Sequence, residues 1–202
     1  MIGTSTKEKL MVAALDLFSQ KGYSATSVDE IAESIGIKGP NLYKYFKGKE
    51  ALIEEISTFT DVAYHQKMSM HNNKAASISS AEEFKEFTMG QLRFTMNDET
   101  VKKLRCMLTI EQFRTEFMKE QATIHQYRNI LDQYSAMISN LMEKGVVKQD
   151  DPEILALEYT SPMSLLIQLC DREPGRMDQA LAMIEKHIDH FTDTYFIKKT
   201  DK

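Results

Sequence analysis

The sequence predicts an all-α protein, and three observations support that fold class. Hydrophobic residues make up 42% of the 202 residues and charged residues 27%, which is the balance of a chain that folds around a core. Only four prolines and eight glycines interrupt it. Its apolar residues recur at intervals of three and four, the period of an α-helix, and no stretch has the alternation of a β-strand. We therefore expect helices throughout.

The first 50 residues predict three short helices. The first spans residues 7–20, where the apolar positions fall on one helical face. Ser27 and the glutamate three residues later have the spacing of a capping box, which starts a second helix, and Gly36 suits the left-handed conformation that ends it. Pro40 fits the first turn of a third helix, over about residues 40–46, because its missing amide hydrogen is not needed there.

Longer helices are expected after this region. An apolar stripe at helical spacing continues from Leu52 to about Met70, and the polar residues 71–80 predict a loop. Breaks between the later periodic stretches place further helices at about 81–96, 98–113, 115–144, 152–170 and 176–197.

The N-terminal pattern is typical of a helix-turn-helix. Two short helices joined by a four-residue turn that contains glycine, with a third helix before them, form that motif. Ala32 is small where the two helices cross, and Leu42 fixes the last helix onto the core. The net charge is −5, but residues 34–49 hold four lysines and no acidic residue. Any contact with DNA is therefore expected to be local.

The outward face of the third helix has side chains that can read DNA bases. At about 100° per residue, Leu42 and Phe46 lie on one side, so the opposite side is centred on Lys44. Lysine can donate to guanine, asparagine can pair with adenine, and a proline ring can pack on a thymine methyl group. We expect Pro40, Asn41 and Lys44 to read bases.

Hydrogen-bond donors on either side of this face suit the DNA backbone. Tyr43, Tyr45, Lys47 and Lys49 are expected to contact phosphates, which fix the register without reading sequence. Lys49 points most clearly to this role, because a cation at a helix N-terminus opposes the helix dipole unless an anion lies beside it. The alternative is that these lysines only solvate a surface helix.

Two runs of residues resemble the signature of the TetR family of transcriptional regulators, namely Gly22-Tyr23-x-x-Thr26-Ser27-Val28-x-x-Ile31-Ala32 and Gly36-Ile37-x-x-x-x-Leu42-Tyr43-x-Tyr45-Phe46-x-x-Lys49-Glu50-x-Leu52. This resemblance covers about residues 7–56. It implies a homodimeric repressor with a DNA-binding domain, residues 1–50, and an effector-binding and dimerisation domain, residues 51–202. A small-molecule effector would release the dimer from a palindromic operator.

The resemblance also extends the predicted DNA contacts. By position it adds Thr26 or Ser27 to the residues that contact phosphates, and we add Lys38, which stands where many members carry a helix-capping serine. Gly39 falls where the family reads bases but has no side chain. Direct readout is therefore expected to rest mainly on Asn41 and Lys44.

The last predicted helix carries a heptad-like apolar seam, which calls for a helical partner. That partner is either a helix of the same chain or a second subunit, and the family resemblance favours a dimer interface made by the last two helices of each subunit. The residues expected at this interface are Leu166, Leu181, Ile184, Ile188, Phe191 and Tyr195.

Methionine is abundant, with 13 residues, and many of them are interspersed with aromatic residues after residue 88. Thioethers repack around varied shapes, so these side chains suit an adaptable effector pocket, although they serve equally well as core filler. The candidates for the pocket are Met89, Phe94, Met107, Phe113, Tyr127, Tyr134 and Met163.

Other classes of function have less support. The sequence has no Glu-x-x-His pair, no glycine-rich phosphate loop and no nucleophile with an evident base, so we expect neither an enzyme nor a cofactor. His187 and His190 lack a third ligand, which argues against a metal site. An all-α enzyme is the remote alternative. A regulator that acts without an effector, or that activates transcription, is the nearer one.

The expected location is the cytoplasm, without attachment to a membrane. The first residues have no apolar signal core. No apolar run approaches the roughly 18 residues that a membrane-spanning helix needs. The expected partners are therefore double-stranded DNA, a second copy of the chain and a small-molecule effector.

Overall fold

The computed structural model of the chain describes residues 5–60, 62 and 77–198. Packing divides the chain into two compact units, called unit 1 and unit 2 below. Unit 1 comprises Met1–Lys67 and Asp98–Thr123, and unit 2 comprises Met68–Asn97 and Ile124–Lys202. Because these units are defined by packing alone, the functional boundary expected after residue 50 stays a prediction.

Among its described residues, unit 1 contains the three predicted N-terminal helices and three later ones. Its apolar side chains form one core, in which Leu10, Phe18 and Leu42 are fully buried. Its helices are α1 (Thr6–Lys21), α2 (Val28–Ser34), α3 (Gly39–Leu42), a helix that begins at Lys49 and continues through Thr60, α6 (Glu99–Glu111) and α7 (Glu116–Thr123).

Helix α6 packs against α1 inside unit 1. Across this contact Lys103 Nζ lies 2.6 Å from Asp16 Oδ1. Asp98 caps the start of α6, because its carboxylate accepts from the amides of Thr100 and Val101 at 3.1 and 3.2 Å. A segment that follows unit 2's first helix in the sequence thus returns to the N-terminal core.

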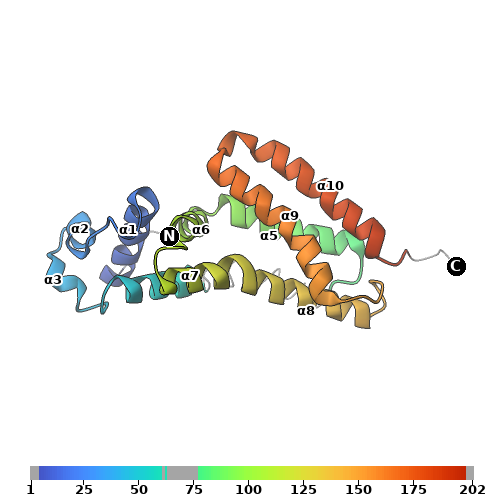
Figure 1. Ribbon diagram of the computed structural model, residues 1–202, viewed down its shortest axis with the longest axis horizontal. Helices are drawn as coiled ribbons and strands as arrows, with labels where there is room; N and C mark the ends of the chain where they lie inside the picture. The colour runs from blue at the N-terminus through green and yellow to red at the C-terminus, as the bar shows by residue number, and fades with distance from the viewer. Residues whose placement is uncertain (1–4, 61, 63–76, 199–202) are drawn as a thin grey trace. The chain divides into compact units, whose positions relative to one another are not determined.

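Unit 2 is built around a pair of long helices that run side by side, α9 and α10 (Figure 1). Helix α8 packs along α9, and α5 packs against α10. The elements of this unit are α5 (Ala81–Asn97), the π-helix η1 (Ile124–Arg128), α8 (Asn129–Glu143), α9 (Pro152–Arg172), the short 3₁₀-helix η2 (Pro174–Arg176) and α10 (Met177–Tyr195).

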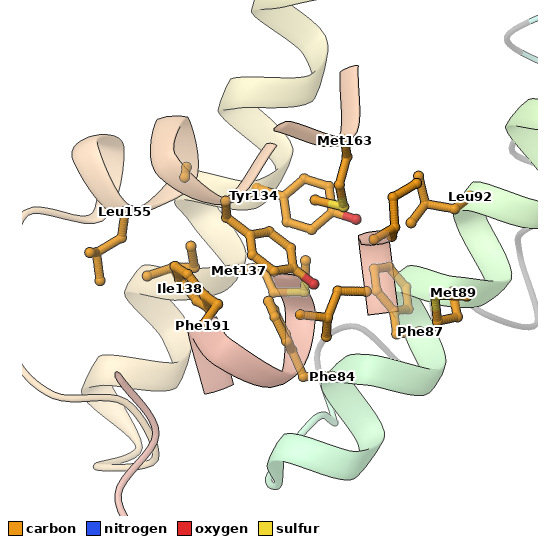
Figure 2. Packing of buried hydrophobic residues seen from close by; sticks show 14 of the residues in the cluster. Phe84, Phe87, Met89, Leu92, Tyr134, Met137, Ile138, Leu155, Met163 and Phe191 are labelled. Carbon is orange, nitrogen blue, oxygen red and sulfur yellow. The ribbon is translucent and has the colours of Figure 1, made fainter. Parts of the chain in front are cut away.

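Aromatic side chains fill the centre of unit 2 (Figure 2). Tyr159 is fully buried and lies against Phe84 and Phe191, with ring centroids 4.9 and 4.6 Å apart. At one end of the core an isolated antiparallel bridge joins Val147 to Phe196. This bridge ties the residues after α10 to the loop between α8 and α9.

The apolar seam of α10 faces this core, which corrects part of the predicted dimer interface. Ile184 and Ile188 are fully buried and Phe191 is 2% exposed, all within unit 2's own core. These three side chains pack inside the chain and do not face a second subunit. Leu166, Leu181 and Tyr195 also pack against the core but are only partly buried. The seam's partner is thus a helix of the same chain.

The helix predicted over residues 115–144 is divided in three. It consists of α7, the π-helix and α8. A π-turn contains an extra residue, and the apolar spacing of three and four did not reveal it in the sequence.

The helix predicted to extend to about Met70 and the loop predicted at residues 71–80 fall partly outside the described residues, because residues 63–76 are not described. No described helix is long and apolar enough to cross a membrane.

Candidate nucleic-acid interface

The predicted helix-turn-helix is fixed by apolar side chains that point inward. Ile31 and Ala32 of α2 and Leu42 of α3 are fully buried, and Phe46 is 3% exposed. Helices α2 and α3 pack closely, and α1 packs against α2. The predicted inward side of residues 40–46, with Leu42 and Phe46, is therefore confirmed.

The turn between α2 and α3 is made by Gly36, as predicted. Its φ is +78°, in the left-handed region that favours glycine. Its amide donates to the carbonyl oxygen of Glu33 at 2.9 Å, and the amide of Ile37 donates to that of Ala32 at 3.0 Å. These bonds satisfy the last carbonyl groups of α2, which is the usual function of a glycine-terminated helix end.

The start of α2 has half of the predicted capping box. The hydroxyl oxygen of Ser27 accepts from the amide of Glu30 at 3.1 Å. The Glu30 carboxylate forms an ion pair with the ammonium group of Lys21 at the end of α1. Glu30 therefore links α1 to α2, and Ser27 alone serves as the side-chain cap of α2.

Gly39 lies where α3 approaches the Asp29 side chain of α2. A Cβ atom at Gly39 would lie 1.6 Å from Oδ1 of Asp29 and 3.3 Å from the Asp29 Cα. Gly39 is buried, whereas its neighbours Lys38 and Pro40 are exposed. The glycine thus allows a close approach between α2 and α3, and a side chain there would require the Asp29 carboxylate to move.

The third helix is shorter than predicted. Regular α-helix ends at Leu42, and the amides of Lys44 and Tyr45 then donate to carbonyl oxygens three residues earlier, at 3.2 and 2.9 Å. The amide of Phe46 returns to the four-residue spacing by donating to Leu42 at 3.0 Å. The chain therefore keeps turning helically through Phe46, but with a tighter last turn.

The side chains opposite Leu42 are open to solvent. Pro40 and Lys44 are exposed, Asn41 is half-buried, and Tyr43 and Tyr45 are 60% and 42% exposed. Large aromatic side chains with free hydroxyl ends are uncommon on a surface that binds nothing. We call this set, residues 40, 41, 43, 44 and 45, the α3 face.

Two lysines flank the α3 face, which itself includes Lys44. Lys38, Lys44 and Lys47 are all exposed, and Ser27 at the start of α2 is exposed as well. Residues 34–49 contain no acidic side chain that would neutralise these cations locally. In a chain with a net charge of −5, this is a local positive surface.

Thr26 and Lys49 have internal partners, which corrects two of the predicted phosphate contacts. Thr26 is 1% exposed, and its hydroxyl donates to the carbonyl oxygen of Gly22 at 2.8 Å. The Lys49 ammonium donates to the carbonyl oxygens of Tyr23 and Thr26, both at 2.8 Å, and lies 4.4 Å from the centre of the Tyr23 ring. These side chains hold the segment between α1 and α2 in place.

Glu111 of α6 lies beside the segment that Thr26 and Lys49 hold in place. No local pattern in the sequence indicates this role of Glu111. Its side chain is 2% exposed, and its Oε2 lies 3.1 Å from Arg114 Nε and 3.5 Å from the hydroxyl of Ser24. A Cβ atom on Gly22, whose φ is +88°, would lie 2.6 Å from Oε1 of Glu111. Gly22 is therefore required both by its backbone conformation and by this carboxylate.

The charges in this cluster shift two pKa values. Burial, together with the negative charges of Glu50 and Glu111, raises the pKa of Tyr23 to about 12. Burial lowers the pKa of Lys49, while the charge of Glu111 opposes that change. A neutral tyrosine is thus the expected form near pH 7.

The structure does not bring the predicted pocket residues together. Met107 is buried in the core of unit 1, and Phe113, in the turn after α6, is 91% exposed. Helical periodicity cannot tell which of two cores a side chain enters. The other five belong to unit 2, where Met89, Tyr134 and Met163 are buried in one cluster, Phe94 is half-buried and Tyr127 is 54% exposed.

A groove of about 270 Å³ lies on unit 2 beside the π-helix. Tyr127 and Leu131 line it from η1 and α8, and Thr160, Leu165 and Gln168 line it from α9. Of the seven predicted pocket residues, Tyr127 is the one among the lining residues of this groove.

Comparisons with known proteins agree on the class of protein. Residues 10–56 match the family model described as bacterial regulatory proteins, tetR family. The chain is 24% identical over 198 residues to YttP of Bacillus subtilis, named a probable HTH-type transcriptional regulator, which covers 95% of this chain and 89% of YttP. A stretch of 49 residues is 43% identical to IcaR of Staphylococcus aureus, the negative transcriptional regulator of the biofilm operon icaADBC, but it spans only 24% of this chain and 26% of IcaR.

The fold is also found in solved structures. SmeT of Stenotrophomonas maltophilia, the repressor of the multidrug efflux pump SmeDEF, matches in its complex with triclosan with a TM-score of 0.77. The match covers 96% of this chain and 93% of SmeT, at 17% sequence identity. A helix-turn-helix followed by a helical C-terminal region is thus a known architecture.

Proposed function

The chain belongs to the TetR family of transcriptional regulators, and from that premise we propose that it is a homodimeric repressor released from a palindromic operator by a small-molecule effector. Its curated relatives are named as regulators of transcription, so DNA binding is its basic activity rather than catalysis. Operator binding, dimerisation and effector binding are each argued below from the positions and exposure of particular residues.

The α3 face is the proposed DNA-reading surface. Asn41 and Lys44, helped by Pro40, read base edges in the major groove, which admits a helix of this size. Tyr43, Tyr45, Lys38, Lys47 and Ser27 contact phosphates on either side. The observation that carries this assignment is the exposure of residues 40, 43, 44 and 45 while Leu42 and Phe46 are buried.

The proposed dimer interface uses the outer side of α9 instead of the buried seam of α10. Ile154, Leu157 and Leu165 are 51%, 42% and 64% exposed. With Ser161 and Gln168 they follow helical spacing along one stripe of α9. Large apolar side chains aligned on one exposed stripe are typical of an oligomer interface. A second copy of the chain is the proposed occupant of this stripe.

Effector binding is proposed for unit 2. The structural relative SmeT is known in complex with triclosan. In this chain, unit 2 contains a π-helix and a core with Met89, Met96 and Met163. The groove beside the π-helix shares Leu157 and Leu165 with the proposed dimer stripe, so the core is the proposed effector region. π-Helices are frequent at functional sites, and methionine side chains adapt to varied ligands.

Selection of binding sites from a random pool of double-stranded DNA tests the proposed function. The full-length chain should enrich a near-palindrome whose half-sites are spaced to place two recognition helices in successive major grooves, roughly 34 Å apart. Enrichment of a single unrepeated site, or of no sequence at all, would contradict a dimeric operator-binding repressor.

A further inference from the structure

Polar side chains lie deep in the otherwise apolar core of unit 2. Thr88 and Gln91 stand one turn apart on α5 and are 0% and 4% exposed. The hydroxyl of Tyr159 donates to Thr88 Oγ1 at 2.8 Å, and the hydroxyl of Tyr134 donates to Gln91 Oε1 at 2.8 Å. Helices α5, α8 and α9 thus meet through two buried hydrogen bonds.

The amide of Gln91 is not fully satisfied by these contacts. Among the described residues, its Nε2 is a buried donor for which the structure provides no hydrogen-bond partner. Turning the amide over would pair Nε2 with Tyr134 but would leave Oε1 in the same position. A buried polar atom in that state destabilises the fold relative to an apolar side chain of similar size. Its presence indicates a second partner that the described residues do not supply.

The surroundings of this amide define what that partner is. Met89 and Leu92 of α5, Tyr134 of α8 and Met163 of α9 are all buried in the same core cluster of unit 2 (Figure 2). Thioether side chains can repack to make room for a ligand. None of the described side chains buried in unit 2 carries a charge. A charged ligand would therefore lose its hydration without gaining an ion pair.

We propose that Gln91 anchors a ligand site in the core of unit 2, whose ligand is an uncharged, mostly apolar molecule with one hydrogen-bond acceptor, such as an aromatic ketone. Nε2 of Gln91 donates to the acceptor, and the methionines enclose the apolar part. This proposal rests on the proposed function, in which unit 2 binds the effector, and it specifies the effector's chemical class.

Equilibrium dialysis of the full-length chain, without DNA, against matched probes tests this site. Benzophenone has a carbonyl acceptor, diphenylmethane has the same two rings without it, and 4-benzoylbenzoate adds a negative charge. Wild-type protein should bind benzophenone about tenfold more tightly than either of the other two probes, which is the range of one buried hydrogen bond. Gln91→Leu should remove the preference for benzophenone over diphenylmethane while retaining binding of the hydrocarbon.

Two further variants keep the result unambiguous. Gln20→Leu, at an exposed position of α1 in unit 1, should leave the ketone preference unchanged, because that glutamine lies outside the core cluster of unit 2. Gln91→Met replaces Gln91→Leu if circular dichroism shows that the latter is unfolded. Equal binding of ketone and hydrocarbon by the wild type, no binding of either, or loss of the preference in Gln20→Leu would overturn the proposal.

The two proposals fail in different ways. A chain that binds benzophenone through Gln91 but enriches no operator sequence would contradict the proposed function and leave this site standing. A chain that enriches an operator but binds the three probes alike would contradict this site and leave the proposed function standing.

Discussion

At the scale of single residues, Lys49 decides how much of the apparent positive charge is available to DNA. Its ammonium donates to two backbone carbonyl groups between α1 and α2 and covers the ring of Tyr23. A bound phosphate would have to compete with these partners. The exposed cations Lys38, Lys44 and Lys47 are therefore the ones that we assign to DNA.

Lys49→Met should destabilise the protein more than it weakens DNA binding. The substitution removes the ammonium donor from the carbonyl oxygens of Tyr23 and Thr26 and leaves the first with only the amide of Thr26 at 3.3 Å, which costs about 1–3 kcal/mol in the free energy of unfolding. Urea denaturation measures this loss, with Lys47→Met at an exposed position as the control. If Lys49→Met leaves stability unchanged but flattens the salt dependence of DNA binding, the lysine contacts phosphate after all.

Gly39→Ala should also destabilise the protein, because the new methyl group meets the Asp29 carboxylate. Displacing that carboxylate is expected to cost about 1–3 kcal/mol, the usual range for overpacking. The double variant with Asp29→Ala should recover most of the loss, since the oxygen atom at 1.6 Å is then gone. Thermal unfolding of the two variants measures this coupling, and equal melting temperatures for single and double variants would argue against the contact.

At the scale of elements, the turn between α2 and α3 sets the direction of the α3 face. Gly36 has a φ of +78°, and no atom lies within 4 Å of a Cβ built on it. Gly36→Ala should therefore cost only the backbone strain of a left-handed residue, about 1–2 kcal/mol. Chemical denaturation gives the value. Gly48→Ala is the control, because it has equal space and no positive φ. A neutral effect of Gly36→Ala would mean that the turn has another conformation.

Local patterns predicted most elements of this fold, and their limits have physical causes. The period of three and four located α1, α2, α5, α6, α9 and α10, and the glycine signal located the turn. The same period did not reveal the π-helix at Ile124–Arg128, because one wider turn shifts the apolar stripe by only a single residue. It also could not show which helix the seam of α10 faces, because a seam is the same for an internal and an external partner.

The candidate site was predictable where the chemistry is local. The inward Leu42 and Phe46 and the outward Lys44 follow from one helical turn. Ser24 and Glu111 are 87 positions apart in the sequence, and the lysine pattern indicates a donor without naming its acceptor. For that reason the sequence pattern predicts phosphate contacts for Lys49 and Thr26, whereas their hydrogen-bond partners lie inside unit 1.

At the scale of the whole molecule, the proposed repressor is a dimer of two copies of the chain. The exposed apolar stripe of α9 is the proposed contact, so Leu165→Glu should convert a dimer at micromolar concentration into a monomer. Leu165 is 64% exposed, and the fold should tolerate the change. Analytical ultracentrifugation measures the mass, and Val12→Glu, at an apolar residue of α1 that is 47% exposed, is the control. A wild-type monomer at these concentrations would count against the stripe as an interface.

The central claim is that the α3 face reads DNA sequence, and the affinity of Lys44→Ala for specific and random DNA tests it most directly. Fluorescence anisotropy, at fixed salt, should give a loss of about 1–3 kcal/mol on the selected operator and a much smaller loss on scrambled DNA. Lys186→Ala, at an exposed lysine of α10, should change neither affinity. An equal loss on operator and scrambled DNA for Lys44→Ala, or no loss on either, would contradict the account.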